Sequence, residues 1–157
     1  MQHQKTATLT TIFSDVLANL AFMFNDDEPG ESTGGEVWIE TTISYRGSES
    51  GTLRLRCPTE FAALLAANLL GIERDDPDVD TKAEDAVKEF MNIVCGQLIT
   101  TWYGAEHVFD LTIPQTQVLM ETPTFSEPDD ISVTTLAVEG HQVQLLHTTP
   151  RVTADIA

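Results

Sequence analysis

The strongest constraint on the fold is the amphipathic stretch from Thr81 to Tyr103, TKAEDAVKEFMNIVCGQLITTWY. Apolar residues recur in it at steps of three and four, which is the period of an α-helix with one buried face. Thr81 followed by Glu84 has the form of a capping box, so we expect the helix to begin there. The apolar positions are Val87, Phe90, Met91, Val94, Cys95, Leu98 and Trp102.

The polar positions of this helix form a stripe of their own. At about 100° per residue, four residues fall within roughly 60° of one another, opposite the apolar face: Asp85, Glu89, Asn92 and Gly96. Glu89 and Asn92 are three residues apart, so one partner can contact both. A carboxylate can pair with a lysine, and a carboxamide can hold and orient a water molecule. The pair can position a nucleophilic water but cannot itself be the nucleophile.

The alternative is a stripe that is only solvated. An acid and an amide on the polar face of an amphipathic helix are more often solvated than functional. Asn has a poorer helix propensity than Ala, Glu or Lys, however, and an interior Gly costs about 1 kcal/mol relative to Ala. The mid-helix positions of Asn92 and Gly96 therefore favour a packing or functional reason.

The spacing Asp85-x-x-x-Glu89-x-x-Asn92, followed by Gly96, resembles the signature of the CheC/CheX/FliY family of chemotaxis phosphatases. The order of the expected elements from Leu9 to His147 resembles that of the CheX members. One departure is Gln97, where the family commonly has Asn. Asn19 and Phe22 of the first helix stand where Glu89 and Asn92 stand in the second unit of a pseudo-repeat, so the first unit lacks the acid–amide pair.

The resemblance implies a phosphatase acting on the aspartyl phosphate of a CheY-type response-regulator receiver domain. Glu89 would dock on the receiver's lysine, and Asn92 would orient the attacking water. Asp85 and Gly96 would contact the partner. The receiver would bring its own Mg²⁺, and this chain would bind no cofactor. The resemblance also implies a homodimer joined through sheet edges, which would cover an edge strand.

Two other functions remain open. One is a non-catalytic binding or scaffold module for a receiver or a flagellar-switch protein, which would keep the helix surface but tolerate loss of Asn92. The other is a structural domain without receiver contact.

Composition narrows these choices. A chain of 157 residues, 41% of them hydrophobic and 21% charged, is typical of one globular domain, so we expect a single domain over 1–157 with loose ends at 1–8 and 149–157. It has no apolar run long enough for a membrane span and no signal peptide, so we expect a cytoplasmic protein without membrane contact. A net charge of −17 with only eight Lys and Arg disfavours nucleic acid and anionic membrane surfaces.

Metal chemistry is not indicated. Cys57 and Cys95 lack zinc-site spacing, and the four histidines are dispersed. Three aspartates before the long helix match the first ligand positions of a calcium loop, but Thr81 and Val87 occupy positions that require Gly and Glu. We therefore interpret this segment as an acidic linker.

The remaining periodicity predicts an α+β fold: a mainly antiparallel sheet of about five or six strands with two long helices packed on it. We expect helices over Leu9–Phe24, Phe61–Leu70 and Thr81–Tyr103. We expect strands over Glu36–Arg46, Thr52–Cys57, His107–Ile113, Gln117–Glu121, Ile131–Val138 and His141–His147, with a loop over Asn25–Gly35.

Overall fold

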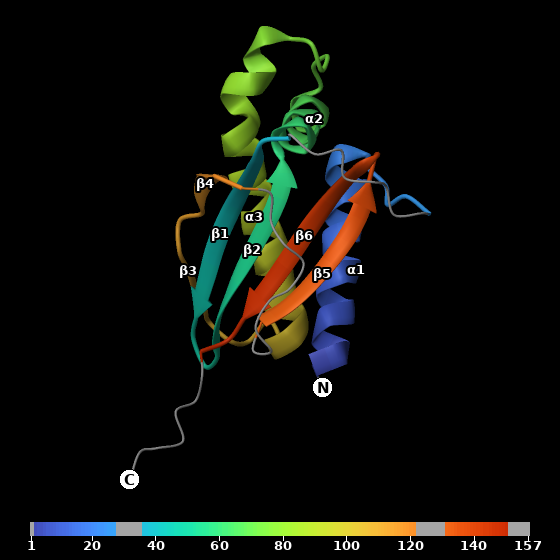
Figure 1. Cartoon of the computed structure of the whole chain (residues 1–157). Helices are drawn as coiled ribbons and strands as arrows, with labels where there is room; N and C mark the ends of the chain where they lie inside the picture. Colours follow the sequence, from blue (N-terminus) through green and yellow to red (C-terminus); the bar gives the residue numbers. More distant parts are fainter. Residues whose placement is uncertain (1, 28–35, 122–130, 151–157) are drawn as a thin grey trace.

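The computed structural model describes residues 2–27, 36–121 and 131–150, which form three helices and six strands (Figure 1). The predicted loop over Asn25–Gly35 lies mostly outside these ranges. The elements in chain order are α1 (Gln2–Ala21), β1 (Trp38–Arg46), β2 (Ser50–Pro58), α2 (Thr59–Leu70), α3 (Pro77–Tyr103), β3 (Asp110–Leu111), β4 (Gln115–Leu119), β5 (Ile131–Val138) and β6 (His141–Thr148).

The six strands form one sheet in the order β3-β1-β2-β6-β5, and β4 also pairs with β1. Every pairing is antiparallel. The two hairpins, β1–β2 and β5–β6, meet in the middle of the sheet through β2 and β6, while β4 and β5 lie at its two edges. The predicted α+β class with a mainly antiparallel sheet and two long helices is confirmed.

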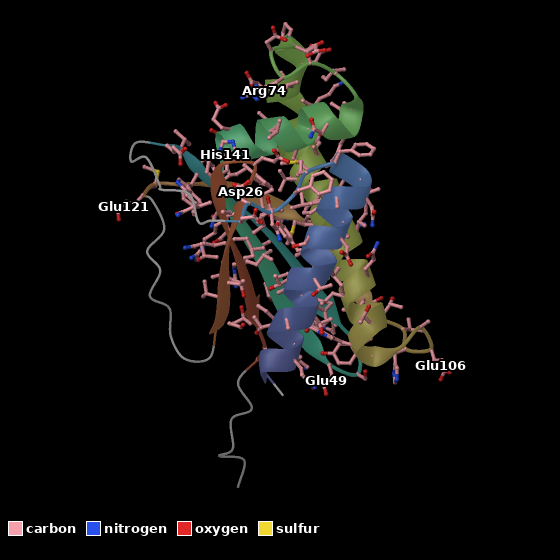
Figure 2. The ribbon with its side chains drawn as sticks, turned by 90° about the vertical axis from the view of Figure 1, so that its right-hand side faces the viewer. Asp26, Glu49, Arg74, Glu106, Glu121 and His141 are labelled. Atoms are coloured by element: carbon pink, nitrogen blue, oxygen red, sulfur yellow. The ribbon has the colours of Figure 1, made fainter. Side chains whose placement is uncertain are left out.

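Both long helices, α1 and α3, lie on the same face of the sheet (Figure 1). They run side by side in opposite directions, and in Figure 2 α3 descends from near Arg74, which precedes it, to near Glu106, which follows it. Phe13 of α1 and Phe90 of α3 meet edge to face with ring centroids 5.4 Å apart. The core between helices and sheet is apolar, and its largest fully buried side chains include Phe13, Leu17, Ile43, Leu53, Leu55, Phe90 and Met91.

The first half of β1, residues 38–41, is buried on both faces of the sheet. Ile43 faces the helices, while Glu40, on the other face of the sheet, is only 6% exposed. Arg56 and Gln117 stand directly opposite Glu40 on the neighbouring strands. Their side-chain nitrogens donate to its carboxylate at 2.7 and 3.0 Å. A carboxylate can be buried there because both neighbours supply hydrogen bonds.

The expected start of α3 at Thr81 is wrong. The helix begins at Pro77, and Asp76 is its N-cap, with its carboxylate accepting a hydrogen bond from the Asp78 amide at 2.9 Å. The Thr81 hydroxyl donates to the Asp78 carbonyl instead. Asp followed by Pro combines a good N-cap with a backbone already set for the first helical turn, so it outcompetes the later capping box.

Other boundaries also differ from expectation. The first helix runs from Gln2 to Ala21 instead of Leu9 to Phe24, so residues 2–8 are not a loose lead-in and the helix ends three residues earlier than predicted. Its first turns are held by tertiary contacts, including Lys5 over the Trp102 ring at 5.2 Å. At the sheet edge, β3 has only two residues and β4 starts at Gln115. Both pair with β1 alone, so the extent of that pairing sets their length.

Candidate functional site

The polar stripe lies on the outward face of α3. Asp85, Glu89 and Asn92 are exposed, and Gly96 is half-buried. The chain neighbours Phe90 and Met91 are completely buried. The helix has 27 residues, which corresponds to about 40 Å of regular backbone. The predicted site residues therefore sit together on a rigid helix whose opposite face is fixed in the core.

Glu89 and Asn92 make no contacts that would occupy their polar groups. No side-chain hydrogen bond or ion pair within residues 2–27, 36–121 and 131–150 involves either residue. By contrast, the buried carboxylate of Glu40 is held by an arginine and a glutamine. The carboxylate of Glu89 and the carboxamide of Asn92 are thus available to a partner.

A shallow groove of about 450 Å³ begins at Asn92 and follows α3 toward its C-terminus. Two threonine hydroxyls form its far end and donate to carbonyls one turn earlier: Thr100 to Gly96 at 2.9 Å and Thr101 to Gln97 at 2.8 Å. Because these hydroxyls are bonded to the helix itself, the groove has a defined shape beside the carboxamide.

Gly96 is not required by the packing of this chain. A methyl group at this position would meet no atom within 4 Å. Gly51 is the opposite case, because a side chain there would collide with the Tyr45 ring. Glycine in a helix interior is unfavourable by about 1 kcal/mol relative to alanine. Since the fold gains nothing visible from Gly96, the open backbone favours close approach by another molecule.

Sequence reasoning missed Lys88. It lies one turn before Asn92, is half-buried, and takes part in no ion pair among the described residues. The chain has only three lysines, and all of them are on α1 or α3: Lys5, Lys82 and Lys88. The arginines Arg54, Arg56 and Arg74 are instead engaged with acids. Lys88 therefore places a positive charge beside the stripe of a strongly acidic protein. Its spacing of four residues from Asn92 puts both side chains on one side of the helix, and this spacing could have identified Lys88 from the sequence.

A larger groove, of about 700 Å³, lies where the start of α1 meets the end of α3. His147 lines it, but its Nε2 atom is 2.9 Å from the Tyr45 hydroxyl. Burial, with a smaller effect from the Lys5 charge, lowers the pKa of His147 to about 4. The histidine is thus neutral and already hydrogen-bonded, which suits a structural role better than proton transfer at neutral pH.

Both cysteines are buried, and the burial of Cys95 agrees with its predicted place on the apolar face of the helix. Burial raises the pKa of the Cys95 thiol to about 12, so it is not a nucleophile at neutral pH. Within the described ranges, no three His, Cys, Asp or Glu residues cluster as metal ligands would. None of the helices in the described part of the chain is long and apolar enough to cross a membrane.

An antiparallel sheet with two long helices on one face is the fold of solved CheX- and CheC-like proteins. The sequence matches the family described as chemotaxis phosphatase CheX over residues 39–141, more than half of the chain. The chain therefore belongs to the CheX family. No individually curated protein matches the sequence.

Solved structures agree on the fold. CheX from Vibrio vulnificus is 15% identical, with a TM-score of 0.70 over 94% of this chain and 99% of that one. A CheC-like superfamily protein from Shewanella sp. PV-4 is also 15% identical, with a TM-score of 0.72 over 96% and 100%. A chain of the CheX-CheY-BeF3-Mg²⁺ complex from Borrelia burgdorferi is 20% identical, with a TM-score of 0.62 over 93% and 97%.

Proposed function

We propose that this chain is a phosphatase acting on the aspartyl phosphate of a CheY-type receiver domain. The observation that carries the proposal is the pair Glu89 and Asn92, exposed side by side on α3 and without partners among the described residues, in a chain of the CheX family. A CheX similar in fold was solved in a complex with CheY, BeF3 and Mg²⁺, which supports a receiver as the partner.

The reaction needs a water molecule placed in line with the acyl phosphate. The Asn92 carboxamide oxygen accepts a hydrogen bond from this water, and its amide group can donate to the phosphoryl group. The water oxygen bonds to phosphorus while the bond to the aspartate oxygen breaks. Inorganic phosphate leaves as H2PO4⁻, which carries the oxygen and both hydrogens of the water, and the receiver carboxylate is regenerated. No covalent intermediate forms on this chain.

Glu89 sets the position of Asn92 in the receiver site. Its carboxylate pairs with the receiver's lysine through a charge-assisted hydrogen bond, which fixes the distance between helix and phosphate. Asp85 lies one turn earlier on the exposed face and contributes to docking. Gly96 allows the receiver backbone to approach the helix. The receiver supplies Mg²⁺, which neutralises phosphoryl charge, and no residue of this chain is assigned to it.

We also propose that the chain forms a homodimer through a sheet edge. The edge strand β4 exposes Val118, and the adjacent Met120 is 94% exposed. An exposed strand edge with apolar side chains favours pairing with a second copy. The molar mass of the protein in solution, measured by light scattering, tests this: a single-chain mass would contradict it. Such a protein would act where receivers act, in the cytoplasm, where its buried thiols stay reduced.

The decisive experiment measures the decay of a phosphorylated receiver with the wild type, Asn92→Ala and Glu89→Ala. Gln4→Ala removes an exposed carboxamide near the start of α1, away from the α3 stripe and from the β4 edge, and serves as the matched control. The proposal requires the first two variants to slow decay and the control to leave it unchanged. Equal decay in all proteins would contradict catalysis. Receiver binding by the wild type without faster decay would identify a scaffold module instead.

A further inference from the structure

The residue that ends α1 is a phenylalanine in the left-handed backbone conformation. Phe22 follows the last residue of the helix and has a φ of +53°. The helix α2 ends in the same left-handed region, but with Gly71 at φ +69°. This conformation suits glycine because a Cβ atom is strained there, by roughly 1–2 kcal/mol. A glycine would end α1 with less strain, so the phenylalanine needs another reason.

The Phe22 ring does not contribute to the core. It is 73% exposed, whereas the next residue, Met23, is completely buried. Large apolar side chains that are exposed singly need no explanation, but one that also strains the backbone does.

The backbone around Phe22 is held on both sides. The Asn68 side chain of α2 donates to the Ala21 carbonyl at 2.8 Å, and the Met23 amide donates to the Leu17 carbonyl at 3.2 Å. Downstream, the Asp26 amide donates to the Ala137 carbonyl of β5 at 2.8 Å, so this segment returns to the sheet (Figure 2). The exposed ring is therefore presented by a fixed backbone, which lowers the entropy lost on binding.

The antiparallel packing of the helices places Phe22 near the candidate site. Phe13 contacts Phe90, and Lys5 lies over Trp102. Later residues of α1 therefore lie level with earlier residues of α3. Nine residues after Phe13, at 1.5 Å per residue, Phe22 lies about 13 Å further along the helix axis, level with the turn that precedes Asp85. Its separation from Asn92 along the helix axis is about 16 Å. Both helices cover the same face of the sheet (Figure 1).

We propose that Phe22 is an apolar anchor for the receiver that Glu89 and Asn92 engage, and that it contacts an apolar patch on that receiver outside the phosphorylation site. The inference rests on the proposed function. A typical protein–protein interface covers about 800 Å² per partner, roughly 30 Å across, so one interface is wide enough to include both Asn92 and Phe22. Buried aromatic side chains are the commonest energetic anchors of such interfaces.

The receiver is favoured over a second copy of this chain because of where the ring lies. Phe22 ends α1, which covers the same face of the sheet as α3 (Figure 1). The exposed apolar residues of the sheet edge, Val118 and Met120, belong to a different part of the molecule, next to β1.

The test is Phe22→Gly, which removes the ring and suits the backbone. We expect a melting temperature equal to or higher than that of the wild type, because glycine relieves the left-handed strain. We expect the Kd and KM for the phosphorylated receiver to rise by about ten-fold or more, with kcat unchanged. Val108→Gly removes another exposed apolar side chain, beyond the far end of α3, and should leave both constants unchanged.

An unchanged Kd and KM in Phe22→Gly would overturn the inference. A loss of the dimer in Phe22→Gly, with receiver affinity retained, would also overturn it and assign the ring to a contact between copies. Failure of the proposed function is recognised separately, because Asn92→Ala would then leave the decay of phosphorylated receiver unchanged. The Kd still reports on Phe22 in that case.

Discussion

Phe13 and Phe90 pack edge to face, with ring centroids 5.4 Å apart and planes at 81°, and both rings are completely buried. This contact connects the two long helices through the core and fixes the rotation of α3 about its axis. Glu89 is the chain neighbour of Phe90, and Asn92 follows two residues later, so burying the Phe90 ring turns both polar side chains outward. Changes on the exposed stripe should therefore alter activity without altering the fold.

Replacing Asn92 with alanine should lower kcat by on the order of 10²-fold, as is usual when one preorganised contact to a transition state is lost. The melting temperature should stay unchanged or rise slightly, because Asn92 is exposed and alanine is a better helix former. Decay of the phosphorylated receiver at saturating concentration measures the effect. Retention of wild-type kcat would exclude a water-orienting role.

Replacing Glu89 with glutamine should act mainly on KM. The variant keeps the shape of the side chain but loses the charge that pairs with the receiver's lysine. A hydrogen bond to a charged group contributes about 1.5–3 kcal/mol, so KM should rise by about ten-fold or more. Titration of the receiver at several salt concentrations provides the measurement. A change confined to kcat would contradict the docking role.

Replacing Gly96 with alanine should separate stability from function. The fold should gain about 1 kcal/mol, because the methyl group meets no atom within 4 Å and alanine favours the helix. Receiver affinity should fall, because the methyl group occupies the open backbone. Gly71→Ala is the control: it should lower the stability, because Gly71 has a φ of +69° and an alanine is strained there. Denaturant unfolding and receiver binding are the two readouts, and unchanged affinity would remove Gly96 from the interface.

Reversing the charge of Lys88 tests local attraction between two acidic partners. A receiver's phosphorylation pocket is acidic and the chain has a net charge of −17, so long-range attraction is weak. In Lys88→Glu we expect slower association and a several-fold higher KM, both diminishing at high salt. Lys82→Glu is the matched control, because Lys82 is ten residues from Asn92 and Lys88 only four. Equal effects of both variants would show that only net charge matters.

The buried His147 should make stability depend on pH. Its pKa in the folded protein is about 4, below its ordinary value of 6.5, because burial and the Lys5 charge disfavour the protonated ring. Between these values the unfolded state binds a proton that the folded state does not. The contribution of His147 to stability is therefore fully present above pH 6.5 and is lost as pH falls toward 4, by on the order of 3 kcal/mol.

Unfolding free energies measured from pH 4 to 7 check this dependence. His147→Gln should flatten the curve in this window, and His107→Gln, which changes an exposed loop residue, should follow the wild type. A wild-type curve as flat as that of His147→Gln would contradict the assignment.

Local sequence patterns predicted the helices and hairpins well, because the geometry of these elements depends mainly on residues close together in the chain. The stripe on α3 follows from the helical period, which needs only neighbouring residues. Errors arose at ends and edges. The start of α3 was placed at Thr81 because Asp76 and Pro77 were interpreted as linker. The strand β3 is shorter than predicted and β4 begins two residues earlier, because the pairing with β1 alone sets their extent.

The sequence by itself determined the fold class, the family resemblance and the placement of Glu89 and Asn92 on one helix face, because these depend on periodicity and spacing along the chain. Only the tertiary structure decided that Glu40 is buried, that Gly96 faces open space and that the Phe22 ring is exposed at the end of α1. The physical reason is that burial, free space and the meeting of α1 with α3 are properties of segments distant in sequence. No local pattern encodes which neighbour each will have.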